Sequence, residues 1–168
     1  LESISRLESG EFKLRYEKFN IVKLVEEIFE TDEMLAKMFN IKLELDGNYS
    51  SSIRVKGDRA RLSEAIGNLI GNSIKYGKNN GKTKVKFTEE GNHIMVEIKD
   101  NGIGINQEDL PRIFERFFRV DKSRSRDSGG TGLGLSIVKH VIQAHKQTID
   151  VSSIPGKGTV FVFSLQKA

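Results

Sequence analysis

The stretch Asp100-Asn101-Gly102-Ile103-Gly104-Ile105 follows an alternating apolar run at 94–98, and Gly130-Thr131-Gly132-Leu133-Gly134-Leu135 precedes a helix-period run at 137–142. Alternation predicts a strand, whereas the 3.6-residue period predicts a helix. Glycine has no Cβ, so both loops let the backbone approach a ligand and present its N–H groups. Amides at a helix start also attract anions, because they lack partners within the helix. The two clusters therefore predict a nucleotide site, with base recognition at the first loop and phosphate binding at the second.

The composition is that of an ordinary globular domain. The chain has 168 residues, 37% apolar and 30% charged, enough for one domain with a real core. No apolar run approaches the roughly 20 residues of a membrane span, and we find no signal peptide. We therefore expect a cytoplasmic fragment of a longer protein, and a membrane anchor elsewhere in that protein stays open. The absence of cysteine excludes disulfides and thiol catalysis, and a net charge of +4 is too balanced to predict nucleic-acid binding.

Apolar periodicity outside the glycine clusters predicts an α+β fold, a two-layer α/β sandwich. The expected strands cover residues 11–19, 41–45, 53–55, 85–87, 94–98, 148–153 and 159–165. Asn20 and Asp58 are suited to cap two helices, the second of which ends near Tyr76. A third helix follows the second glycine cluster. The polar stretch 121–130 lacks periodicity and predicts a mobile loop.

The helix that begins after Asp58 has an unusual polar face. At 100° per residue, Glu64, Asn68, Asn72 and Lys75 share one side of this helix, opposite its apolar residues. Such a row is often simply a solvated face, but asparagine is a mediocre helix former. An amide oxygen can ligate Mg²⁺, and an ammonium nearly one turn later can contact phosphate. The row therefore favours a metal–polyphosphate ligand.

Other candidate motifs do not fit their patterns. The stretch 77–83 resembles a Walker A loop, but it is one residue short between its glycines and precedes a strand, so we predict a turn. Neither glycine cluster has the third glycine of G-x-G-x-x-G. The three histidines are scattered, which argues against zinc.

Four segments, 68–76, 100–105, 114–119 and 130–135, resemble the N, G1, F and G2 boxes of sensor histidine kinases, in that family's order. The turn at 155–159 is also similar to the family's, and the resemblance spans about residues 12–166. The fold it implies is the Bergerat-type ATP-binding sandwich shared with type II topoisomerases, chaperone ATPases and mismatch-repair ATPases. That fold has a mixed, mainly antiparallel sheet covered on one face by about three helices.

The resemblance implies a role for individual residues. Asn72 would ligate Mg²⁺, Lys75 and Arg119 would contact the phosphates, and these three form the implied catalytic set. Asp100 would accept the adenine amino group, and Tyr76, Ile105 and Leu133 would enclose the ring. The nucleotide-binding residues that the resemblance implies are Asn68, Asn72, Lys75, Tyr76, Asp100, Gly102, Gly104, Ile105, Arg119, Gly130, Thr131, Gly132, Leu133, Gly134 and Thr159.

Some of these residues have a plainer interpretation. Tyr76 could cap the apolar edge of its helix, and Arg119 could be a solvated arginine of the lid expected over 112–130. Phe114, Phe117 and Phe118 are more typical of packing anchors than of ligand contacts.

The sequence departs from the family's pattern in two places. No histidine has the setting of a phosphoacceptor; residues 1–10 resemble only the end of the dimerisation hairpin, which leaves 11–168 as the catalytic domain. Ala144-His145-Lys146-Gln147 replaces the common Ala-His-Gly-Gly, which puts the turn into the next strand in doubt.

The resemblance implies a protein-histidine kinase that uses ATP and Mg²⁺ and phosphorylates a histidine on the absent dimerisation domain. The expected partners are that domain and, for the full-length protein, a response regulator; the fragment itself should be monomeric. Two alternatives stay open: an ATP-hydrolysing conformational switch of the same fold, and a nucleotide-binding pseudokinase. The hydrolases place a water-activating glutamate four residues before the metal asparagine, where this chain has Asn68.

Overall fold

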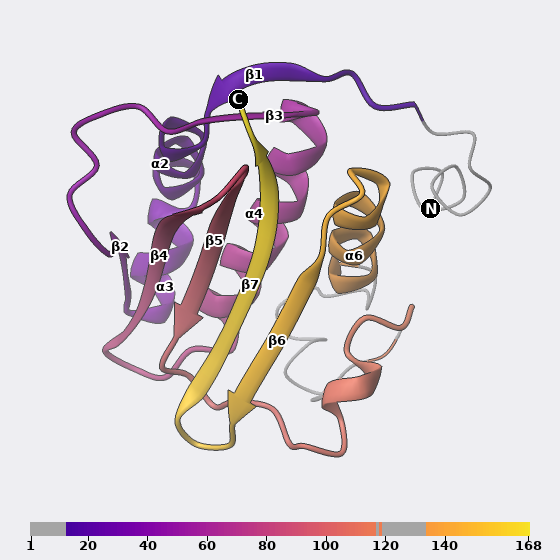
Figure 1. Cartoon of the computed structure of the whole chain (residues 1–168). Helices are drawn as coiled ribbons and strands as arrows, with labels where there is room; N and C mark the ends of the chain where they lie inside the picture. The colour runs from indigo at the N-terminus through magenta and orange to yellow at the C-terminus, as the bar shows by residue number, and fades with distance from the viewer. Residues whose placement is uncertain (1–12, 117, 119–133) are drawn as a thin grey trace.

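The computed structural model describes residues 13–116, 118 and 134–168, and all structural statements concern that part of the chain (Figure 1). Its centre is a seven-stranded sheet in the order β1-β3-β7-β5-β4-β2, with β6 also paired to β7. The strands are β1 Glu17–Asn20, β2 Ile41–Leu45, β3 Arg54–Gly57, β4 Gly81–Glu90, β5 His93–Asp100, β6 Ile149–Ile154 and β7 Gly158–Lys167. Among the described strands, only the β2–β4 pair is parallel. The predicted mixed, mainly antiparallel sheet is therefore confirmed.

In residues 13–116 and 134–168, four α-helices accompany the sheet, and they lie on one side of it in Figure 1. They are α2 Ile21–Thr31, α3 Glu33–Phe39, α4 Arg59–Lys75 and α6 Gly134–Ala144, with a short 3-10 turn, η1, at Leu110–Arg112. The sandwich was predicted with about three helices, and α3 is the addition. It has seven residues and buries only Ala36, while Met34 and Met38 are exposed. A helix without an apolar stripe gives no periodic signal in the sequence.

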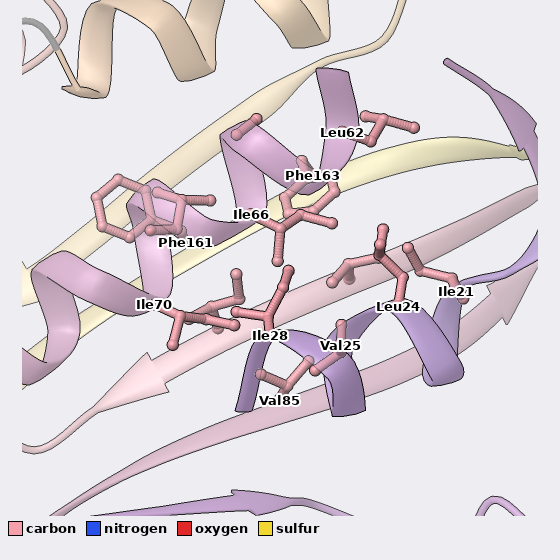
Figure 2. Close-up of a cluster of buried hydrophobic side chains, with 14 of the residues drawn as sticks. Ile21, Leu24, Val25, Ile28, Leu62, Ile66, Ile70, Val85, Phe161 and Phe163 are labelled. Atoms are coloured by element: carbon pink, nitrogen blue, oxygen red, sulfur yellow. The ribbon is translucent and has the colours of Figure 1, made fainter. Parts of the chain in front are cut away.

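The core forms between the helices and the inner face of the sheet. Ile66 and Ile70 of α4 meet Phe161 and Phe163 of β7, and Ile28 of α2 lies beside them (Figure 2). All five are at most 7% exposed. Complete burial of such a side chain stabilises the fold by about 1.5–3 kcal/mol. This cluster therefore fixes α4 against the central strands of the sheet.

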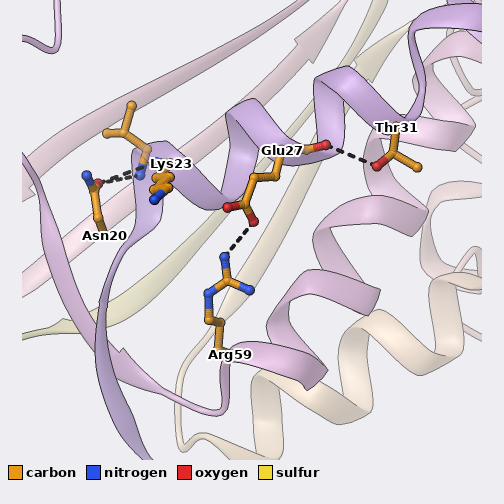
Figure 3. A network of polar contacts seen from close by, with 6 residues as sticks. Asn20, Lys23, Glu27, Thr31 and Arg59 are labelled. Atoms are coloured by element: carbon orange, nitrogen blue, oxygen red, sulfur yellow. Dashed lines mark hydrogen bonds and ion pairs between the residues drawn. The ribbon is translucent and has the colours of Figure 1, made fainter.

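The starts of α2 and α4 follow the predicted caps. The Asn20 side chain accepts hydrogen bonds from the Val22 and Lys23 amides at 3.0 and 3.4 Å, and Figure 3 shows these bonds. Asp58 accepts one from the Arg61 amide at 3.2 Å. Arg59 and Glu27 then join the two helices through a 2.6 Å ion pair, also visible in Figure 3. Such caps each contribute about 1 kcal/mol.

Two strand boundaries were predicted wrongly. The first strand was expected over 11–19, but β1 covers 17–20 and residues 13–16 are not in a strand. Its partner β3 ends opposite Glu17, so pairing stops there. The stretch 77–83 was predicted as a turn, yet β4 already begins at Gly81, because 81–85 pair in parallel with β2. The turn is limited to 77–80.

The turn after α6 forms without the glycine pair that is common in the kinases the sequence resembles. Lys146 takes its place in the left-handed region, with φ of 59°. The Lys146 amide donates to the Gln143 carbonyl at 2.9 Å, and the Gln147 amide to that of Ile142 at 3.1 Å. The left-handed conformation costs a lysine on the order of 1 kcal/mol. The two backbone hydrogen bonds that close the turn offset this cost.

His145 joins the end of α6 to the start of α4. The histidine is 5% exposed. Its Nδ1 lies 2.8 Å from the Val141 carbonyl oxygen and its Nε2 accepts from the Asp58 amide at 2.9 Å. The carbonyl can only accept, so the ring is neutral with its proton on Nδ1. Burial lowers the pKa of His145, opposed by the Val141 carbonyl and the Asp58 carboxylate.

We expect His145 to make stability depend on pH. The unfolded chain takes up a proton near pH 6.5 and the folded chain only at lower pH, so stability falls as pH drops below about 6.5. His145→Phe should lose about 1–3 kcal/mol at pH 7, because the Asp58 amide loses its acceptor, and should flatten that dependence. Urea unfolding between pH 5.5 and 7.5 measures both effects.

The matched control is His93→Phe, since His93 is exposed on β5. An unchanged pH dependence in His145→Phe would contradict the assignment of the buried neutral ring.

No helix in the described ranges has the length and apolar character of a membrane span.

Candidate functional site

Asp100 ends β5 with its carboxylate held by backbone. Its Oδ1 accepts from the Gly102 amide at 2.9 Å and from the Thr159 amide at 3.3 Å. Thr159 lies directly opposite Asp100 on β7. Burial raises the pKa of Asp100, and the two amide hydrogen bonds oppose that rise. The result is a half-buried, oriented acceptor at the predicted base end.

The glycines of the first cluster make room for protein backbone. A Cβ on Gly102 would lie 2.3 Å from the Tyr76 carbonyl oxygen, and one on Gly104 would lie 2.3 Å from that of Ile154. Gly104 also has φ of 75°, which favours glycine. The Gly102 amide is already used by Asp100. In the described part of the chain, these two glycines therefore shape the loop around Asp100.

Tyr76 and Ile105 flank the same loop. Tyr76 is the C-cap of α4, and its carbonyl accepts from the Ile103 amide at 3.2 Å. The Ile105 amide donates to Ser153 Oγ at 2.7 Å. Both Tyr76 and Ile105 are half-buried. The fold thus brings two of the three predicted ring-enclosing residues to the loop, while the third, Leu133, lies outside the described residues.

The polar row on α4 divides by exposure. Asn68, Asn72 and Lys75 are half-buried, whereas Glu64 is exposed. Asn68 Nδ2 donates to the Gly134 carbonyl at 3.4 Å, 66 residues away. This contact places the amide row beside the first turn of α6, where the sequence predicted the phosphate end.

Lys75 has an acidic neighbour that the sequence did not reveal. Asp32 stands between α2 and α3, and burial raises its pKa while the charge of Lys75 lowers it. Asp32 makes no side-chain cap for α3. The two residues are 43 positions apart and belong to no common motif, so only the packing of α4 against the α2–α3 junction brings them together.

Part of the predicted phosphate end lies outside the described residues. This applies to Arg119, to Gly130, Thr131, Gly132 and Leu133, to Phe117, and to 119–130 of the predicted lid. Gly134 is the first residue of α6.

The two described phenylalanines of the third box, Phe114 and Phe118, are half-buried and pack against the core. Phe114 stacks edge-on against Phe161 with centroids 6.2 Å apart. Arg112 lies 4.5 Å over the Phe118 ring. Packing of Phe114 against β7 agrees with the interpretation of this residue as an anchor.

The site contains two hydroxyl residues that were not predicted, Ser153 and Thr83. Ser153 Oγ contacts Thr159 Oγ1 at 2.8 Å, and Thr83 is paired with Asp100 across β4 and β5. Both residues are buried. A polar residue on the apolar face of a strand was the available signal, since buried polar side chains usually serve a partner.

Chemically, the described elements offer acceptors at one end and an amide–ammonium row with a helix start at the other. The Asp100 carboxylate, as an acceptor, suits an amino-bearing base, and the row with the helix start suits a polyphosphate with its metal ion. In the described residues there is no cluster of three or more histidine, cysteine or acidic side chains that could hold a metal alone.

Comparison with known proteins identifies similar molecules. Residues 57–168 match the family described as histidine kinase-, DNA gyrase B- and HSP90-like ATPases. The sensor-like histidine kinase SenX3 of Mycolicibacterium smegmatis is 39% identical over 165 residues, covering 98% of this chain and 42% of SenX3. The chain thus spans less than half of that relative.

Solved structures show the same likeness. The nucleotide-free catalytic domain of the histidine kinase ThkA is 30% identical, with a TM-score of 0.76 over 91% of this chain and 98% of that domain. The structure of ThkA in complex with the response regulator protein TrrA aligns at a TM-score of 0.76 and 26% identity, over 99% of this chain and 47% of that one.

Proposed function

The chain belongs to the histidine kinase-, DNA gyrase B- and HSP90-like ATPase family as a histidine kinase catalytic domain, and we propose that it donates the γ-phosphoryl group of Mg-ATP to a histidine elsewhere in its parent protein. In this proposal the catalytic domain covers residues 11–168, and residues 1–10, which resemble the end of a dimerisation hairpin, lie outside the described residues. The observation that carries the proposal is the 3.4 Å contact from Asn68 to Gly134. It supports a phosphate end built jointly by α4 and α6, opposite the base end at Asp100.

The residues that would hold the nucleotide fit it. The oriented Asp100 acceptor suits the adenine amino group. Asn72 offers an amide oxygen to Mg²⁺ and Lys75 an ammonium to the phosphates, with Arg119 and the amides of 130–134 as further phosphate ligands. Bound Mg²⁺ supplies charge neutralisation of the phosphates. The protein's contribution is then positioning and electrostatic stabilisation.

Asn68 favours phosphotransfer over hydrolysis. It stands where related ATPases place a water-activating glutamate, and its Nδ2 is engaged with Gly134. A carboxamide cannot act as a general base at neutral pH. The proposed partners are the dimerisation hairpin and a response regulator, by analogy with ThkA in its complex with the response regulator protein TrrA. We also propose that the catalytic domain by itself is a monomer and lies in the cytoplasm.

The test is phosphotransfer to a supplied hairpin. Incubated with γ-labelled ATP and Mg²⁺, the chain should bind nucleotide, release little phosphate and remain unlabelled. Adding the dimerisation hairpin of its parent should produce acid-labile phosphate on the hairpin's histidine.

Each alternative has its own outcome. Rapid phosphate release without a hairpin would indicate the hydrolase, and binding without transfer would indicate the pseudokinase. Stable acid-labile phosphate on His93, His140 or His145 would contradict the assignment.

A further inference from the structure

A row of four polar side chains crosses the sheet at the base end. Thr83 on β4 is opposite Asp100 on β5, Asp100 is opposite Thr159 on β7, and Thr159 is opposite Ser153 on β6. Paired residues share a face of a sheet, and here it is the face that carries the apolar core. Thr83, Thr159 and Ser153 are 0%, 5% and 7% exposed. Because each buried hydroxyl has one proton and needs a partner for it, the direction of each hydrogen bond can be deduced.

Ser153 accepts a hydrogen bond from the Thr159 hydroxyl. Ser153 Oγ lies 2.8 Å from the Gly158 carbonyl oxygen, which can only accept, so the Ser153 proton goes there. The Ile105 amide donates to the same Ser153 oxygen at 2.7 Å. The 2.8 Å contact between the two hydroxyls must then be donated by Thr159. Because its only hydroxyl proton is engaged in this bond, the Thr159 oxygen can only accept further hydrogen bonds.

The same arrangement occurs on the other side of Asp100. Ser73 Oγ on α4 donates to the Ile70 carbonyl at 2.6 Å. The 2.7 Å contact between Ser73 and Thr83 must therefore be donated by Thr83. Both threonine protons point away from the carboxylate between them.

Asp100 itself offers one oxygen to a base. Its Oδ1 already accepts two backbone amides, so Oδ2 is the acceptor that remains. A carboxylate with both oxygens available could accept two adjacent N–H groups of guanine side by side. With Oδ1 engaged, that bidentate arrangement is lost, and a single amino group is the better match.

We infer that Ser153 is a positioning residue for base specificity. By accepting the Thr159 hydroxyl hydrogen bond, it leaves only acceptors at the base end and so excludes purines with an oxygen at position 6. The inference rests on the proposed nucleotide function and deepens it. The adenine amino group donates to this end, whereas the position-6 oxygen of hypoxanthine or guanine meets lone pairs. A site whose polar groups are left unpaired by the wrong base rejects it strongly.

The test compares ATP with inosine triphosphate, which carries oxygen in place of the amino group at position 6. In Ser153→Ala the Thr159 hydroxyl loses its acceptor and can turn to donate to that oxygen. We expect the preference for ATP, as the ratio of the two dissociation constants, to fall by about 10-fold, the order of one hydrogen bond. Ser153→Thr keeps the hydroxyl and should keep the preference.

The matched control is Ser152→Ala, the same substitution one residue away on the exposed face. A double-mutant cycle isolates the mechanism, because Thr159→Val removes the hydroxyl that Ser153 orients. In that background Ser153→Ala should leave the preference unchanged. Ser73→Ala, acting through Thr83, provides a second variant if Ser153→Ala does not fold.

The outcomes separate this inference from the proposed function. Equal weakening of ATP and inosine triphosphate by Ser153→Ala would show that Ser153 only supports the Ile105 loop, and would overturn the inference. The inference would also be overturned if Ser153→Ala lowered the preference for ATP by the same factor in the Thr159→Val background. Failure of the unaltered chain to bind ATP would instead overturn the proposed function.

Discussion

Replacing Asp100 with asparagine should weaken binding of ATP and ADP by a similar factor, with or without magnesium. The base is common to both nucleotides, and the change removes a charge-assisted hydrogen bond of roughly 1.5–3 kcal/mol, or about 10- to 150-fold in affinity. The carbonyl oxygen of asparagine can still accept from the Gly102 and Thr159 amides. Its amino group, however, occupies the position that should accept from adenine. Calorimetric titration with both nucleotides measures the loss.

The pH dependence gives a second check on Asp100. Its raised pKa means that protonation, and with it loss of the acceptor, begins at higher pH than for a carboxyl of ordinary value 3.8. Affinity of the unaltered chain should therefore fall on the acid side, and Asp100→Asn should lack that decline. Asp150→Asn, on the exposed side of β6, is the control. Unchanged ATP affinity in Asp100→Asn would show that Asp100 does not contact the base.

Asn72→Ala should weaken nucleotide binding only when magnesium is present. Substitution of even a supporting residue at a metal site costs about 10- to 100-fold in metal affinity, and loss of a direct ligand should cost at least as much. Alanine is the better helix former by several tenths of a kcal/mol, so α4 should remain intact. Titrations of ATP and ADP with Mg²⁺ and with EDTA distinguish the metal effect.

Glu64→Ala is the control for Asn72, since Glu64 is exposed on the same face two turns earlier in α4. If Asn72→Ala weakened nucleotide binding in EDTA as much as in Mg²⁺, Asn72 would act on the nucleotide directly or on the fold. Its predicted role as a metal ligand would then be wrong.

Local sequence determined much of this molecule. The caps at Asn20 and Asp58 and the apolar period of α4 are short-range properties, because the hydrogen bonds of a helix join residues only four positions apart. The alternation that ends at Asp100 likewise predicted β5 and placed the carboxylate at its end. For the same reason the asparagine–lysine row could be recognised on one side of α4 from spacing alone.

Tertiary structure decided what surrounds those residues. Thr159 reaches Asp100 across 59 positions and Asn68 reaches Gly134 across 66, and strand register, which no local pattern encodes, sets the first of these. Register also shortened β1, lengthened β4 and aligned Ser153 with Thr159. The direction of the hydrogen bond between Ser153 and Thr159 depends on the Gly158 carbonyl, which the neighbouring strand β7 supplies. Residue types thus specified the chemistry available, and long-range pairing specified which way each donor and acceptor faces.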